Sequence, residues 1–331
     1  MASPSTNAEE NTTIQPNLSA RFHPNTTEFN VFANIIAWSA QEAGADCWAE
    51  VITRNASSIS DDIQQVNFNW NVGFRIGMGY GMSHDQWDTQ VYYTWFHTRG
   101  KDHASQQGAE VHSAFLGNFY VENSKGAGLS GPYYESASIN WTIHFNMFDW
   151  ELGRNFWTTK SLALRPFIGL KGGWIHQFIN SQWNHPISPL TTPFNVGIEN
   201  IKNNFWGIGP EVGINTKWVL HNEHNDVFSI FGDLSGAIMW GHWSFSDGYQ
   251  NDIQQQVIVD LQPVNSGAYM VKAFAGLEWE ITHKTNFQFS TKLGYEMQFW
   301  LDQLQFYSFT GGRQDNLLTL QGGTIAFCFA F

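Results

Sequence analysis

The side chains most able to do chemistry are six basic and six acidic residues that recur on one parity of alternating segments. Because successive side chains of a strand point to opposite faces, residues of one parity line the same side of a sheet. Charges of a single sign would predict strong ion selectivity, whereas equal numbers predict a weakly selective channel. The twelve residues are Arg75, Asp88, Arg165, Lys171, Glu211, Lys217, Asp233, Lys272, Glu278, Glu280, Lys292 and Glu296.

Two interpretations of this charged face stay open. Charges paired across strands would fill the interior of a small barrel with side chains. Glycines of the same parity favour instead an open pore, because they leave room beside the charges. These glycines are Gly73, Gly77, Gly79, Gly169, Gly173, Gly207, Gly209, Gly213 and Gly294.

The chain also has twelve histidines, which could suggest a metal site or a hydrolase at the rim of a barrel. A general base must lie within hydrogen-bond reach of its water or nucleophile, and spacing alone does not establish this. Only His221 and His224 have a ligand-like spacing, in an expected turn. The sequence therefore predicts no catalytic residue, no metal site and no cofactor. Histidines near expected rims or outer loops are His97, His103, His112, His176, His185 and His242.

Long alternating strands must position these side chains, and residues 66–82 are the clearest example. The segment is about three times the length of an average strand in soluble domains. Such a pattern suits a sheet with lipid outside and water inside. The apolar parity is Val66, Phe68, Trp70, Val72, Phe74, Ile76, Met78 and Tyr80. The other parity is Asn67, Asn69, Asn71, Gly73, Arg75, Gly77, Gly79 and Gly81.

Similar alternation recurs along the chain and predicts an all-β fold, a transmembrane antiparallel up-and-down barrel. We expect ten strands, counting the less regular residues 29–54 as one, with twelve as the alternative. Within 137–147 the apolar parity is assigned to lipid, so Ile143 faces the membrane and Thr142 the lumen. Short and long connections alternate, as in bacterial barrels, with long polar loops expected at 99–132, 180–202 and 244–266.

The chain ends on an alternating aromatic strand that contains Phe327, Phe329 and Phe331. A terminal aromatic residue of this kind looks like the insertion signal of outer-membrane barrels, read by the barrel-assembly machinery. Aromatic residues make up 16% of the chain and its mean hydropathy is −0.30, which together suit a barrel with aromatic girdles rather than a helical membrane protein. We therefore expect a location in the bacterial outer membrane, within the Gram-negative cell envelope.

The remaining features bound the domain organisation and the partners. Residues 1–28 are expected to be a flexible lead in the lumen or periplasm, and residues 29–331 the barrel. No signal peptide is visible at the start, so we interpret the chain as a mature form. Its net charge of −13 argues against binding nucleic acid. Cys47 and Cys328 could form a bridge, stay as thiols or link two molecules.

Several segments together resemble the Legionella-type major outer membrane protein family, which is also found in chlamydia-related bacteria. The resemblance implies a pore-forming porin without catalytic residues. We expect passive diffusion of small hydrophilic solutes and ions, with membrane lipid as a partner and a homo-oligomer left open. The alternative is a structural or adhesive surface barrel with a packed interior. The resembling segments are residues 69–77, 95–98, 165–175 (with Arg165-Pro166-Phe167) and 205–210 (with Trp206-Gly207-Ile208-Gly209-Pro210).

Overall fold

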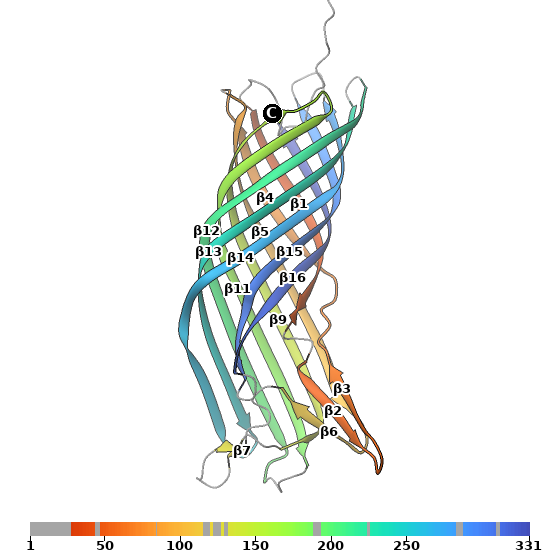
Figure 1. The fold of residues 1–331 in the computed structure, drawn as a ribbon, viewed down its shortest axis with the longest axis vertical. Helices are drawn as coiled ribbons and strands as arrows, with labels where there is room; N and C mark the ends of the chain where they lie inside the picture. The colour runs from red at the N-terminus through yellow and green to blue at the C-terminus, as the bar shows by residue number, and fades with distance from the viewer. Residues whose placement is uncertain are drawn as a thin grey trace, which may run out of the picture.

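The computed structural model is a closed ring of long, tilted antiparallel strands (Figure 1). The structure describes residues 28–43, 47–83, 85–114, 120–121, 127–128, 132–187, 193–223, 226–282, 287–308 and 312–331. The ring closes where the first and last strands pair, from Asn30 opposite Ala330 to Glu42 opposite Leu318. This confirms the predicted ten-stranded antiparallel barrel. Its strands are β1 (Glu28–Glu42), β4 (Asn71–Gly81), β5 (Trp87–Ser105), β9 (Tyr134–Arg154), β11 (Leu162–Pro186), β12 (Val196–Glu223), β13 (Asp226–Asn251), β14 (Gln256–Thr282), β15 (Gln288–Ser308) and β16 (Gly312–Ala330).

Among the described residues, six short strands lie outside the ring. β2 (Ala49–Arg54) pairs with β3 (Ile59–Gln64) and with β6 (Ala109–Ser113), and β6 meets β9. β7 (Tyr120–Val121) pairs with β8 (Ala127–Gly128), and β10 (Phe156–Trp157) pairs with β11. The prediction of one strand over residues 29–54 is therefore wrong, because β1 ends at Glu42 and the chain continues into a separate hairpin. The ring still has ten strands, since neither β2 nor β3 takes part in its closure.

The two ends of the barrel differ in their connections. At the end where Figure 1 marks the C-terminus, only residues 82–86 join β4 to β5, and 224–225 join β12 to β13. The opposite end carries the β2, β3 and β6 sheet and the longest connections (Figure 1). Bacterial barrels keep short turns in the periplasm and long connections outside, so the end with β2 and β3 is the external end.

Much of the expected loop sequence is strand. β11 continues to Pro186 and β12 begins at Val196, with Gln177 opposite Asn203 and Trp183 opposite Gly197. β13 continues to Asn251 and β14 begins at Gln256, so the loops predicted at 180–202 and 244–266 are wrong over most of their length. At 99–132 the loop prediction is wrong as far as Ser105, where β5 ends, and again over β6, β7 and β8. These segments resembled loops because their outward side chains are polar.

Along β11 the surface chemistry inverts while the parity stays the same, whereas bulges shift the register within β14 and β15. On β11, Leu170 and Trp174 are exposed and Lys171 is buried, but further on Asn180 and Gln182 are exposed and Trp183 is buried. We call the part with apolar outward side chains the membrane half (on β11, 164–174) and the rest the external half (on β11, 176–186). The barrel therefore extends beyond the membrane as a water-exposed cylinder with an apolar interior.

The inversion corrects the assignment of residues 137–147. Ile143 is fully buried inside the barrel, and Thr142 and His144 lie on the outward parity of β9. The prediction that Ile143 faces lipid is therefore wrong. Val66 and Phe68, placed on the lipid face from the sequence, are also buried in the apolar core of the external half. The rule that apolar residues face outward holds only where the surroundings are lipid.

Candidate functional site

The structure places all twelve predicted charged residues on the inward parity of their strands. Ten of them are buried, while Asp233 and Lys292 are half-buried beside a lumenal cavity. They come from strands on every side of the ring, because each long strand of the membrane half keeps its polar parity inward. That they line an open pore stays a prediction, because their contacts join them across the lumen.

One network is centred on Arg165 of β11. Its Nη2 atom lies 2.5 Å from Oδ1 of Asp88, and its Nη1 atom lies 2.7 Å from Oε2 of Glu151. Nη1 also donates to Asn215 Oδ1 at 2.7 Å. Asn155 donates in turn to Asp88 at 2.9 Å. One guanidinium thus ties β11 to β5, β9 and β12, which holds these four walls of the lumen at fixed spacing.

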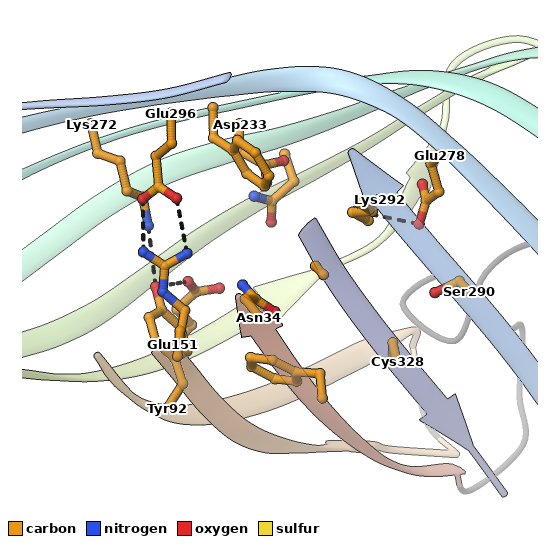
Figure 2. Close-up of a pocket in the computed structure, with 15 residues that line it drawn as sticks. Asn34, Tyr92, Glu151, Asp233, Lys272, Glu278, Ser290, Lys292, Glu296 and Cys328 are labelled. Carbon is orange, nitrogen blue, oxygen red and sulfur yellow. Dashed lines mark hydrogen bonds and ion pairs between the residues drawn. The ribbon is translucent and has the colours of Figure 1, made fainter. Parts of the chain in front are cut away.

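A second network crosses the barrel. Arg75 of β4 makes a bidentate pair with Glu296 of β15, with donor–acceptor distances of 2.7 and 3.1 Å. Strands β1 and β16 separate β4 from β15 in the ring, so this pair spans a chord of the lumen. Figure 2 shows Tyr92 beside it: Tyr92 donates to Glu151 at 2.8 Å and accepts from Lys272 at 3.2 Å. A fork-on-fork pair of this kind fixes geometry as well as charge.

The remaining basic side chains also meet acids. Lys217 Nζ lies 2.5 Å from Glu280 and 3.5 Å from Glu278. Lys292 lies 3.4 Å from Glu278. A further pair joins Lys171 to Asp149, with Glu211 at 3.5 Å. Five of the six lumenal cations are therefore ion-paired, and the sixth, Lys272, donates to Tyr92.

A small cavity lies between these networks (Figure 2). Its volume of about 60 Å³ holds only a few water molecules. Among the described residues that line it, Asn34 Oδ1 and Asp233 Oδ1 have no hydrogen-bond partner within the protein. Buried polar atoms are normally satisfied by protein or by water. The cavity is therefore a hydrated part of the lumen.

The external side of this charged lumen is closed by four aromatic side chains, which we call the aromatic plug: Trp38, Phe96, Phe145 and Trp300. At most 1% of each is exposed. Ring centroids lie 5.5 Å apart for Trp38 and Phe96 and 5.4 Å apart for Phe145 and Trp300. Arg75 Cζ lies 5.9 Å from the centre of the Trp38 ring, so the plug begins where the charged networks end. Beyond it the external half is filled by buried side chains that include Trp141, Trp183, Trp243 and Phe205.

A pair of acids is buried within this apolar core. Burial, together with the neighbouring Glu199, raises the pKa of Asp247 to about 10. Glu199 accepts hydrogen bonds from Ser181 at 2.9 Å and from Trp183 at 3.3 Å. At neutral pH, Asp247 is therefore a neutral acid that can share its proton with Glu199.

Three histidines stand side by side on the outward face, at the boundary between the two halves. His97 is opposite His144, and His144 is opposite His176. The Nδ1 atoms of His97 and His144 are 3.1 Å apart. Burial and the neighbouring histidines lower the pKa of His144. Among the described residues, no three histidine, cysteine or acidic side chains are grouped so that they could hold a metal ion. The same part of the chain contains no helix long and apolar enough to span a membrane.

Comparison with known proteins agrees with this architecture. The family model of the Legionella pneumophila major outer membrane protein precursor matches residues 23–331. The chain belongs to this family. It is therefore an outer-membrane β-barrel protein, as the sequence predicted. No curated protein matches the chain.

Solved structures match the chain at low similarity. The outer membrane protease OmpT of Escherichia coli is 12% identical over 95% of this chain and 98% of its own, with a TM-score of 0.39. A major outer membrane protein of Thermus thermophilus is 10% identical over 92% and 100%, with a TM-score of 0.33. At this level of similarity neither match carries an argument about activity.

Sequence reasoning missed three inward side chains of the membrane half of this family member: Asp149, Glu151 and Tyr92. Asp149 and Glu151 fell in a stretch interpreted as a connection, although they alternate with the exposed Phe148 and Trp150. That alternation was the signal that could have found them, because it continues the strand of residues 137–147, with the apolar side chains now at even-numbered positions. Tyr92 was treated as an apolar residue, and its position in the sequence does not indicate that it bonds to Glu151 and Lys272.

The expected insertion signal and the cysteines are also located. Phe329 and Phe331 are exposed on the outward parity, and Phe331 lies 5.7 Å from Phe287, centroid to centroid. Recognition of Phe327, Phe329 and Phe331 by the assembly machinery stays a prediction. Cys328 lies in β16 opposite Phe32, whereas Cys47 lies next to β2 at the external end, so the structure does not bring the two together. A link between two molecules stays a prediction.

Proposed function

We propose that the protein is a narrow outer-membrane porin that passes water, ions and small hydrophilic solutes with weak selectivity, and that it has no catalytic role. The observation that supports this most is the charged interior of the membrane half. Its six cations face acids that include the six predicted ones together with Asp149 and Glu151. Buried ion pairs stabilise a fold no better than well-packed apolar side chains do. A hydrated, charged lumen is therefore more useful for transport than for stability.

In this proposal the described arrangement of side chains corresponds to a closed form of the porin. The aromatic plug and the mainly apolar core behind it fill the described interior of the external half with buried side chains. Apolar constrictions in channels close by excluding water, and small side-chain movements that admit water open them. Conduction therefore requires displacement of Trp38 and Trp300, which lie directly outside the charged networks.

A second function, a structural surface barrel with a permanently packed interior, is favoured by a different observation. Five of the six lumenal cations are paired, and the external half is packed like the core of a soluble domain. Such a barrel would present the outer surfaces of β2, β3 and β6 to the surroundings. It would need no pore.

Single-channel recording in planar bilayers separates the two functions. The variant replaces two plug residues, Trp38→Ala with Trp300→Ala, and the control replaces two lipid-facing tryptophans, Trp240→Ala with Trp279→Ala. For a porin we expect small conductance steps in the unmodified protein and steps several-fold larger in the plug variant alone. If the unmodified protein and the plug variant are both silent while heat-modifiable gel mobility shows folded barrels, the structural function replaces the porin.

A further inference from the structure

The outward wall over β5, β9, β11 and β12 is organised in rows that the transport function does not use. One row is aromatic: Trp95 lies opposite Asn146, which lies opposite Trp174, which lies opposite Trp206. Tryptophan concentrates at the level of lipid headgroups in outer-membrane barrels. The row therefore marks where the external surface of the membrane meets this wall.

Cations lie directly beyond that aromatic row. The row of His97, His144 and His176 comes first. Two residues further along their strands, Arg99 and Lys202 lie in a common row that crosses the same four strands. Strands are spaced about 4.8 Å apart, so these two cations are separated by roughly 14 Å. Both face outward on a protein whose net charge is −13, which makes this wall a local site for anions.

Each side of the aromatic row also has a groove. The external groove is open and lined by Arg99, Lys101, His103, Asn140, Asn180 and Gln182. The only acid among the described residues that line it is Asp102, which accepts a hydrogen bond from Trp48 at 2.8 Å. This groove therefore offers cations and amides to a ligand, with its acid engaged elsewhere.

The membrane-side groove is apolar and lies on the same four strands. Trp150, Leu170, Trp174 and Trp206 form its walls, and the glycine backbone at 172 forms its floor. A Cβ atom at Gly172 would lie 3.2 Å from Ile208 Cγ1, so a side chain there would fill the groove. The groove faces the lipid.

We propose that this wall is a binding site for one phosphorylated lipid of the external leaflet. An acyl chain lies in the apolar groove over Gly172, and the phosphate lies between Arg99, Lys101 and Lys202. The histidine row donates hydrogen bonds at the level between chain and phosphate. The aromatic side chains of the membrane-side groove match the acyl chain of the lipid, and the cations of the external groove match its phosphate. The site is independent of whether the lumen conducts.

Native mass spectrometry of the full-length protein in detergent tests the proposal, with phosphatidylglycerol and phosphatidylcholine of identical chains as probes. The headgroup variant is Arg99→Gln with Lys101→Gln and Lys202→Gln. The control removes two cations at the periplasmic end, Arg154→Gln with Lys160→Gln. Each Lys or Arg near an anionic lipid strengthens binding roughly fivefold. We therefore expect the headgroup variant to lose affinity for phosphatidylglycerol by at least about tenfold, and the control to change little.

Filling the groove tests the chain end of the site. Gly172→Leu should weaken the binding of both long-chain lipids and leave dihexanoyl phosphatidylglycerol unaffected. Three results would overturn the proposal: an equal loss in the headgroup variant and its control, displacement of the lipid by inorganic phosphate, or a change in oligomeric state with unchanged lipid preference. The last result would assign the wall to contact with a second copy of the chain. Bilayer conductance enters none of these measurements, so failure of the porin function leaves the test valid.

Discussion

On β11, Leu170 and Trp174 face outward beside an inward Lys171, whereas further along the same strand Gln182 faces outward beside an inward Trp183. The backbone is the same extended strand in both places, and the parity never shifts. What changes is the surroundings, because the membrane half meets lipid and the external half meets water. The hydrophobic effect selects the side chains that face away from water, so it places apolar residues outside in one half and inside in the other.

This comparison also separates two kinds of interior. In the membrane half the walls are held at fixed distances by charge pairs such as Arg75 with Glu296 and Arg165 with Asp88. In the external half the walls are held by aromatic packing, for example between Phe205 and Trp243, whose ring centroids are 4.8 Å apart. Loss of either partner of a buried ion pair lowers the stability of the membrane half, whereas the stability of the external half depends on the side-chain volume that is removed.

The largest effect is expected from breaking a charge pair in the membrane half. Lys217→Met should lower the free energy of unfolding by about 3–5 kcal/mol, because it leaves the buried Glu280 carboxylate without its cation. The combination of Lys217→Met with Glu280→Leu should recover most of that loss. Urea unfolding in lipid vesicles measures both variants. A double variant no more stable than Lys217→Met would show that the unpaired Glu280 carboxylate is not the cause of the loss.

Arginine scanning on one face of β11 sharpens the comparison directly. Ile168→Arg should lower the free energy of unfolding by about 2–4 kcal/mol, because it places a charge against the lipid. Asn180→Arg, on the same face in the external half, should change it by less than about 0.5 kcal/mol. The same unfolding assay serves both. Similar losses for the two variants would mean that the membrane covers the external half as well.

The external core should respond to pH through Asp247. Its folded pKa is raised above the unfolded value, so the native state keeps a proton that the unfolded chain has lost. Stability should therefore be greatest below about pH 4 and fall as the pH rises towards about 10. Asp247→Asn should flatten this fall. Unfolding free energies at about pH 5 and about pH 9 measure it, and an unchanged slope in the variant would contradict the assignment.

The smallest effect is expected from Lys272, which makes no ion pair among the described residues. Lys272→Gln should leave the unfolding free energy nearly unchanged and shift the ion preference of a conducting barrel towards cations, because the acids then outweigh the bases further. Charge effects are screened beyond about 8 Å at physiological ionic strength, so the shift should shrink as salt increases. Reversal potentials under a salt gradient measure it. Lys171→Gln is the contrasting variant, and its main effect should be on stability.

The architecture was accessible from sequence because alternation is a local property. Segments such as 66–82 and the final strand show a period of two, and the alternation of short and long connections implies closure of the ring. Inward charges such as Lys217 and Glu278 were also identified, since parity alone places them. The external extensions of β11 to β14 were not, because polar residues that face water look the same on a strand as in a loop.

Sequence by itself determined which residues share a face, since the two-residue repeat of a strand follows from its backbone geometry. It did not determine which face is inside: Ile143 and Ile168 are equally apolar, yet one is fully buried and the other is 60% exposed to lipid. Only the closed barrel decides this, through the height of each residue relative to the membrane. Closure also decides the partners, because Arg75 and Glu296 are 221 residues apart in sequence and meet across the lumen. No local pattern encodes a contact made by the curvature of the whole sheet.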